Sequence, residues 1–306
     1  MVTSSSFYFN GKDGQSLYAR KWTSTSKPKA IVQITHGMAE HIGRYEDFAS
    51  FLVSHELFVY GNDHRGHGHT ATREEDIGYF TDNNGYETIV EDMERLTEVI
   101  QKEFPNTPIF LFGHSMGSFL SRRYIQLFGD CLQGVILSGT GGHPGFIGKV
   151  GYIIASREAK KHGRRKSSTR MNDLTFGSYN KSFMPVRSSF DWLSRNEKEV
   201  NKYIQDPLCG AVFTAGFFAD FLKGLLSIYN DDDKIPKDLP IYFFSGTEDP
   251  VGKQTKGVLQ NIHHLQAMNL EDISYKFYPE GRHEMLNEIN KEEVYSDILE
   301  WILTHI

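Results

Sequence analysis

Short apolar runs alternate with longer segments of helical periodicity along the first 140 residues. The runs are rich in aliphatic and aromatic residues and are bounded by turn residues, as buried parallel strands are: Ala30–Thr35, Leu57–Asn62, Pro108–Gly113 and Gly134–Ser138. In Tyr86–Phe104, apolar residues recur at spacings of three and four, which places them on one face of a helix. This alternation predicts an α/β fold with a mostly parallel sheet covered by helices.

A second group of strand-like runs follows after a long interruption. In residues 141–236 helical patterns dominate and no apolar run of the first kind occurs. Strand patterns return at Pro240–Ser245 and Ile273–Tyr278, and apolar spacing predicts a final helix. At the other end of the chain, Phe7–Trp22 has Asp13-Gly14 at its centre and predicts an antiparallel edge hairpin. We therefore expect a core of residues 1–140 and 237–306 with an eight-stranded sheet, and a helical cap of residues 141–236 inserted after strand 6.

The composition narrows the class of protein. Of the 306 residues, 33 are basic and 39 acidic, and the net charge of −6 argues against nucleic acid as the main partner. The two cysteines, Cys131 and Cys209, do not suggest a disulfide framework. No secretory leader is visible, and no run approaches the roughly 20 apolar residues of a membrane-spanning helix. These features predict a cytoplasmic protein with at most peripheral membrane contact, and they leave its oligomeric state open.

The strongest chemical signal is the pentapeptide Gly113-His114-Ser115-Met116-Gly117, a G-x-S-x-G sequence. It directly follows a predicted strand and opens a helical pattern. In this context a tight turn presents the serine hydroxyl freely, and the helix N-terminus favours developing negative charge. Ser115 is therefore the candidate nucleophile, and it needs an activating base from elsewhere in the chain.

Two residues that follow later strands are candidate partners of Ser115. His283 follows the last predicted strand, and Asp249 follows the strand before it. Because parallel strands place their carboxyl ends at one edge of the sheet, both loops are expected beside Ser115. His283 would be the general base and Asp249 the acid that orients it; Glu248 competes, but Pro250 restricts the backbone of Asp249. The chain order Ser115, Asp249, His283 is the order found in α/β-hydrolases.

The oxyanion of such a reaction requires two backbone N–H donors. One is expected from Met116, the residue after the nucleophile, and the other from the loop after the third strand. In that loop we assign the donor to Met38. His36 and Gly37 would brace the loop, since glycine permits conformations that a side chain would hinder.

Histidines also cluster at His64, His67 and His69. Three nearby imidazoles can hold a metal ion when further ligands complete the set. No carboxylate or thiolate set lies at ligand spacing from these histidines, so no metal site is predicted.

Six motifs in one order give the chain a specific resemblance. They are His36-Gly37-x-x-Glu40-His41 with Gly43-Arg44-Tyr45, Asp63-His64-Arg65-Gly66-His67-Gly68, the pentapeptide around Ser115, Asp206-Pro207-Leu208, Gly246-x-x-Asp249, and His283-Glu284-x-Leu286-x-Glu288. Across residues 7–304 the chain resembles the monoacylglycerol lipase and lysophospholipase family of α/β-hydrolases, within the serine aminopeptidase S33-like hydrolases. The resemblance implies the α/β-hydrolase fold with a helical cap, acyl-ester hydrolysis without a cofactor, and a pocket for one acyl chain. Met38 stands where the family often has a small residue and Ser118 where it often has glycine, which leaves the ester open.

The insertion offers a candidate pocket and leaves alternatives open. In Gly210–Leu226, Phe213, Phe217 and Phe221 recur every four residues and could line an acyl pocket, although an ordinary buried helix has the same pattern. A prolyl-type aminopeptidase would instead need an acidic cluster in the cap, where four carboxylates are available: Asp173, Asp191, Glu197 and Glu199. A non-catalytic ligand-binding or scaffold protein would not need a nucleophile. The residues favour ester hydrolysis through a Ser-His-Asp triad and an acyl-enzyme intermediate, and the resemblance implies small-molecule lipid esters, monoacylglycerols or lysophospholipids, as substrates.

Overall fold

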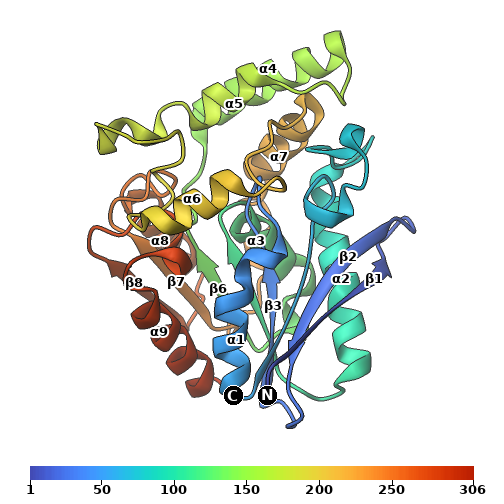
Figure 1. Ribbon diagram of the computed structural model, residues 1–306, viewed down its shortest axis with the longest axis vertical. Coiled ribbons are helices and arrows are strands. Elements are labelled where there is room, and N and C mark those ends of the chain that lie inside the picture. Colours follow the sequence, from blue (N-terminus) through green and yellow to red (C-terminus); the bar gives the residue numbers. More distant parts are fainter.

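One eight-stranded sheet runs through the protein, and the computed structural model describes all 306 residues (Figure 1). The strands are β1 (Thr3–Asn10), β2 (Ser16–Thr23), β3 (Ala30–Thr35), β4 (Leu57–Asn62), β5 (Ile109–His114), β6 (Gly134–Ser138), β7 (Ile241–Gly246) and β8 (Ile273–Tyr278). They lie in the order β1-β2-β4-β3-β5-β6-β7-β8, with β1 and β2 antiparallel to their neighbours and the other six parallel. The predicted eight-stranded, mostly parallel sheet with an edge hairpin is confirmed.

Helices cover both faces of the sheet, which is why most of its parallel strands are apolar throughout. In β5, Phe110 and Phe112 point to one face and Leu111 to the other. α1 (Glu46–Ser54) and α9 (Lys291–Thr304) pack on the face with the two phenylalanines. α2 (Gly85–Glu103), α3 (Met116–Phe128) and α8 (Lys256–Ala267) pack on the opposite face. Two hydrophobic layers therefore hold the central strands, and with them the loops at their carboxyl ends, in fixed positions.

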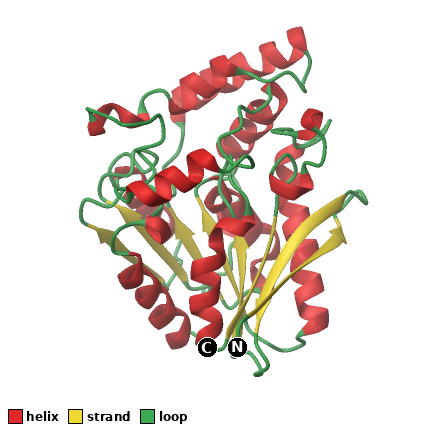
Figure 2. Cartoon of the chain, in the orientation of Figure 1, coloured by secondary structure: helices red, strands yellow, loops and turns green.

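Four α-helices lie between β6 and β7 and form half of residues 141–236, which we call the insertion: α4 (Gly145–His162), α5 (Thr169–Phe176), α6 (Glu197–Gln205) and α7 (Ala215–Ser227). They lie above the carboxyl ends of the parallel strands, and α4 packs along α7 (Figures 1 and 2). The side chain of Thr214 caps α7 by accepting a hydrogen bond from the Phe217 N–H. None of the helices combines the length and the apolar character needed to cross a membrane.

Candidate active site

Ser115 occupies a sharp turn between β5 and α3. Its backbone has φ 53° and ψ −118°, a combination that residues with side chains rarely adopt. A Cβ at Gly117 would lie 2.0 Å from the Thr35 carbonyl oxygen, and one at Gly113 would lie 2.4 Å from Ser121 Oγ. Because both positions lack a side chain, α3 can begin against β3, and Ser115 is left at the wall of a cavity.

Asp249 and His283 meet just beyond the carboxyl ends of β7 and β8. Both carboxylate oxygens of Asp249 lie 3.0 Å from His283 Nδ1, and both side chains are almost fully buried. The Val251 N–H donates to Asp249 Oδ1 at 2.9 Å and fixes the carboxylate. His283 and Ser115 line the same cavity, but their side chains form no hydrogen bond in this structure. Catalytic hydrogen bonds are often long without substrate and tighten when it binds.

Opposing effects set the pKa of His283. Burial disfavours the charged imidazolium, but the Asp249 carboxylate outweighs burial and raises the pKa above its ordinary value of 6.5. Glu284 and Glu40 add to this rise. The ring of His114 lies 4.7 Å from that of His283, and burial lowers the pKa of His114 to about 4, so this neighbour is neutral at pH 7. The surroundings therefore stabilise His283 after it receives a proton, as a general base requires.

The loop after β3 is braced by its own side chains. His36 Nε2 accepts a hydrogen bond from the His64 N–H at 3.0 Å, so Nδ1 carries the proton and donates to the Gly37 carbonyl at 2.7 Å. Glu40 Oε1 accepts a hydrogen bond from the Gly37 N–H at 2.6 Å. The peptide groups on both sides of Gly37 are thus held by side chains, and we call residues 36–41 the oxyanion loop.

Gly37 lies close to Ser115 within this loop. A Cβ at position 37 would lie 2.7 Å from Glu40 Oε1 and 3.2 Å from Ser115 Cβ, so close approach requires glycine there. We predicted that a side chain at position 37 would hinder the conformation of the loop; the hindrance comes from lack of space, because the φ of Gly37 lies outside the left-handed region. Met38 and Met116 line the same cavity as Ser115. Both residues to which we assigned oxyanion donors are therefore beside the candidate nucleophile.

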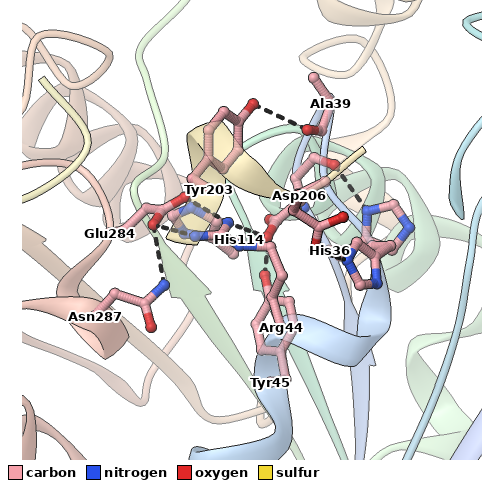
Figure 3. Close-up of polar contacts among 12 residues, drawn as sticks. His36, Ala39, Arg44, Tyr45, His114, Tyr203, Asp206, Glu284 and Asn287 are labelled. Atoms are coloured by element: carbon pink, nitrogen blue, oxygen red, sulfur yellow. Dashed lines mark hydrogen bonds and ion pairs between the residues drawn. The ribbon is translucent and has the colours of Figure 1, made fainter. Parts of the chain in front are cut away.

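A buried guanidinium connects the oxyanion loop to the loop of His283 (Figure 3). Arg44 Nη1 donates to Glu40 Oε2 at 2.8 Å and to Glu284 Oε1 at 2.7 Å, and Nη2 donates to Glu284 Oε2 at 2.7 Å. Burial works against ionisation of Glu284, but Arg44 outweighs burial and lowers the pKa of Glu284 to about 2. Glu284 is therefore charged at neutral pH.

The insertion contacts the His283 loop through its backbone. The Trp192 carbonyl accepts a hydrogen bond from the His283 N–H at 3.4 Å, and the Leu193 carbonyl accepts one from the Glu284 N–H at 2.7 Å. The Trp192 ring also lies 4.9 Å from the His283 ring. The backbone of the candidate base is thus held partly by residues far from it in the sequence.

The insertion also contacts the oxyanion loop (Figure 3). Tyr203 Oη and the Gly210 N–H both donate to the Ala39 carbonyl, each at 2.9 Å. Ala39 has a left-handed backbone with φ 60°, which is unfavourable for alanine. His41 Nε2 and Asp206 Oδ2 lie 2.9 Å apart and add a third contact. These contacts hold the strained loop in place.

Side chains of the types that bind metal ions lie at the contact between His41 and Asp206. One group of three brings its ligand atoms within 4.8 Å of one another: His41, Asp206 and Cys209. The Gly43 N–H donates to His41 Nδ1 at 3.2 Å, so the His41 proton lies on Nε2 and is shared with Asp206. Burial raises the pKa of the Cys209 thiol, which favours its protonated form. The group is therefore a hydrogen-bonded connection between the insertion and the oxyanion loop.

A cavity of ≈ 960 Å³ lies between the insertion and the core and includes Ser115 and His283 in its wall. Ile154, Leu222 and Leu225 from α4 and α7 form part of that wall. Aromatic side chains of the insertion form other parts of the wall: Phe176, Tyr179, Phe190, Trp192 and Tyr203. The size and apolar character of the cavity suit a hydrophobic small molecule.

Of the three phenylalanines predicted to line an acyl pocket, only Phe221 lines the cavity. Phe213 and Phe217 pack against each other inside the hydrophobic core, with ring centroids 4.4 Å apart. The prediction is wrong for these two residues because α7 and the residues just before it are buried on more than one side, so apolar side chains point into the core as well as into the cavity. Phe218, which the four-residue spacing missed, lines the cavity.

Sequence reasoning gave no role to Glu40, Arg44 and Glu284, although all three lie in the quoted motifs. The spacing of Glu40 and Arg44, four residues apart, is that of a local ion pair and could have indicated their contact. Glu284 lies 240 positions from Arg44, and no local pattern reveals that pairing. Trp192 and Tyr203 were likewise missed. Both lie in the insertion, and no distinctive motif surrounds Trp192.

Comparisons with known proteins agree with the fold. A family model described as serine aminopeptidase, S33 matches residues 26–290. Human monoglyceride lipase is 28% identical over 297 residues, which cover 95% of this chain and 88% of the relative. The monoacylglycerol lipase of Mycolicibacterium smegmatis is 25% identical over 308 residues, which cover 99% of each chain.

A solved structure extends the comparison. The carboxyl esterase from Bacillus coagulans, in complex with glycerol, superimposes with a TM-score of 0.91 at 27% identity and covers 99% of this chain and 98% of its own. The predicted α/β-hydrolase fold and the predicted class, a carboxylic ester hydrolase, are confirmed. The chain belongs to the serine aminopeptidase S33 family of α/β-hydrolases, and monoglyceride lipases are among its relatives.

Proposed function

We propose that the protein hydrolyses esters of single-chain lipids, monoacylglycerols or lysophospholipids, through a triad of Ser115, His283 and Asp249. One arrangement carries the proposal: the strained Ser115 turn and the buried Asp249–His283 pair share a largely apolar cavity. The printed names of the relatives, monoglyceride and monoacylglycerol lipase, support this substrate class. In this proposal residues 141–236 are the cap over the site, and residues 1–140 and 237–306 are the core.

Acylation begins when Ser115 Oγ attacks the acyl carbonyl carbon and His283 Nε2 takes the hydroxyl proton. The carbonyl electrons move to oxygen, where the N–H groups of Met38 and Met116 stabilise the negative charge. The carbon–oxygen bond to the alcohol then breaks, and His283 returns the proton to the departing alcohol. The acyl group remains on Ser115 as an ester.

Deacylation repeats these steps with water as the nucleophile. His283 takes a proton from the water as its oxygen attacks the acyl carbon. The bond to Ser115 Oγ breaks, Ser115 recovers a proton from His283, and the fatty acid leaves. None of these steps requires a metal ion or a cofactor.

The charges around the cavity favour this proposal over a prolyl-type aminopeptidase. An aminopeptidase needs free carboxylates in the cavity for the amino group of its substrate. Of the four carboxylates considered in the insertion, only Asp173 lines the cavity. Asp191, Glu197 and Glu199 are paired with basic side chains of the insertion.

The outer surface of α4 supports peripheral membrane contact as part of the proposal. Phe146 and Ile147 are 79% and 82% exposed, and Val150 and Ile153 are also exposed. Ile147 and Val150 line the cavity as well, so the exposed apolar surface is continuous with it. Such a surface suits a lipid interface. Ile147→Ser should reduce flotation with phosphatidylcholine vesicles, and unchanged flotation would contradict this part of the proposal.

The function is tested with 1-monoacylglycerol, lysophosphatidylcholine, p-nitrophenyl esters of increasing chain length and proline arylamide. We expect wild type to hydrolyse the esters and to react with a fluorophosphonate probe. Ser115→Ala should fold and do neither. Ester turnover by Ser115→Ala, or a preference for proline arylamide, would overturn the proposal. A wild-type protein inert to the probe would favour a binding or scaffold role.

A further inference from the structure

Arg44 is hydrogen-bonded to two loops, to the oxyanion loop through Glu40 and to the loop of His283 through Glu284. Its side chain is only 10% exposed and donates three hydrogen bonds of 2.7–2.8 Å, one to Glu40 and two to Glu284. The ring of Tyr203, from α6, lies 4.8 Å from the guanidinium carbon and covers it from the insertion side. No hydrogen bond directly joins the oxyanion loop to residues 281–288.

Each carboxylate that Arg44 holds is one step from a group used in the proposed reaction. Glu40 also accepts the Gly37 N–H at 2.6 Å and the Tyr45 hydroxyl at 2.9 Å, and Gly37 directly precedes Met38. Glu284 directly follows His283 in the chain and is fixed by Asn287 at 3.0 Å. The path from the oxyanion donor to the base therefore passes through Glu40, Arg44 and Glu284.

We propose that Arg44 is a positioning residue that sets the distance between the oxyanion donor of Met38 and the base His283. This inference rests on the proposed function of the triad. A planar guanidinium can hold two carboxylates in fixed directions at once, whereas an ammonium group is a point charge without that geometry. Misplacing catalytic groups by about 1 Å can cost about 100-fold in rate.

Arg44 also balances the charge that faces His283. The groups that face this imidazole are Asp249, Glu284 and Glu40, the neutral ring of His114, and the Arg44 cation. Without Arg44 the buried Glu284 loses the cation that keeps it ionised, so it takes up a proton and the negative potential at His283 decreases. The pKa of His283 then falls, and the acid limb of the activity profile moves to lower pH. A residue with a purely structural role would not move this limb.

The chain offers a matched control in Arg65. This guanidinium is 1% exposed and also bridges two carboxylates, Asp13 and Asp92. None of these three residues lines the cavity. Arg65→Met therefore removes a buried guanidinium that bridges two carboxylates outside the wall of the cavity.

The experiment measures kcat, KM and the pH profile with p-nitrophenyl butyrate for Arg44→Met, Arg44→Lys, Arg65→Met and Ser115→Ala, with circular dichroism to check folding. We expect Arg44→Met to lower kcat by about 10- to 100-fold with little change in KM and to move the acid limb to lower pH. Arg44→Lys should return the acid limb of the pH profile to its wild-type position but restore only part of the wild-type kcat. Folded Arg65→Met should keep wild-type kcat.

Two results would overturn the inference. One is wild-type kcat with an unmoved acid limb in folded Arg44→Met; the other is an equal loss of kcat in Arg65→Met. If Arg44→Met does not fold, Arg44→Lys decides, because full kcat in that variant contradicts the need for a bridging guanidinium. Activity in Ser115→Ala would instead refute the proposed function.

Discussion

Replacing Asp249 with asparagine tests how the base is oriented. At present His283 Nδ1 faces two carboxylate oxygens at 3.0 Å, so the proton lies on Nδ1 and Nε2 is free to accept the proton of Ser115. Asparagine has nearly the same shape but can present an NH₂ group to Nδ1. That contact favours the tautomer with the proton on Nε2, which cannot act as base. We expect kcat to fall by about 10⁴-fold, which corresponds to about 5.5 kcal/mol of transition-state stabilisation.

The same substitution moves the pH dependence in a defined direction. The reaction requires neutral His283, so activity is lost as the pH falls through the pKa of this residue. In the wild type burial lowers the pKa, but Asp249, with Glu284 and Glu40, raises it above 6.5, so we expect the acid limb of kcat/KM above pH 6.5. In Asp249→Asn burial still disfavours the charged imidazolium of His283, but its main counter-ion is gone, so the pKa of His283 falls. The acid limb therefore moves to lower pH while the rate falls.

The assay is kcat/KM for p-nitrophenyl butyrate from about pH 5 to pH 9, with urea midpoints to compare folding. Glu248→Gln is the matched control, because Glu248 makes no hydrogen bond to His283, and it should retain wild-type values. An Asp249→Asn rate within tenfold of wild type, or an acid limb that rises, would refute this account of the base. A large loss in Glu248→Gln would transfer the orienting role to Glu248.

Two further predictions concern strain and the cavity wall. Thr255 has φ 70° and ends three consecutive residues with left-handed backbones, so Thr255→Gly should stabilise the protein by about 1 kcal/mol and raise the urea midpoint. A lower midpoint would show that the threonine side chain contributes more than the strain costs. Phe221→Ala should change the relative kcat/KM across p-nitrophenyl esters of different chain length, because Phe221 lines the cavity. Phe213→Ala should leave that profile unchanged but cost about 3–5 kcal/mol in unfolding free energy, and the reverse pattern would place Phe213 in the pocket.

The sheet and the position of Ser115 could be predicted because local patterns determine them. The six parallel strands lie within one residue of their predicted bounds, since each is a short apolar run between turn residues. The meeting of Asp249 with His283 follows from topology, because parallel strands end at the same edge of a sheet. Recognising each strand from its own sequence pattern was therefore enough to predict that these loops meet.

The walls of the cavity could not be predicted in the same way. Nine of the 13 residues of α7 are buried, so the period of apolar residues does not separate the core face from the cavity face. This is why Phe217 was placed in the pocket and Phe218 was not; Phe213 precedes α7 and packs against Phe217 in the core. The Arg44 bridge was hidden for a different reason, because its partners lie on two loops that only the folded chain brings together.

Substrate selection and catalytic geometry depend on the same segment of this chain. The insertion forms much of the cavity wall, and its Trp192 and Leu193 carbonyls also hold the backbone of the His283 loop. Its Tyr203 and Gly210 hold the carbonyl of Ala39, whose left-handed backbone costs about 1 kcal/mol or more when it is not supported. Removing or loosening the insertion would therefore release both loops as well as open the cavity. Changes in this segment that alter which ester binds are expected to change kcat together with KM.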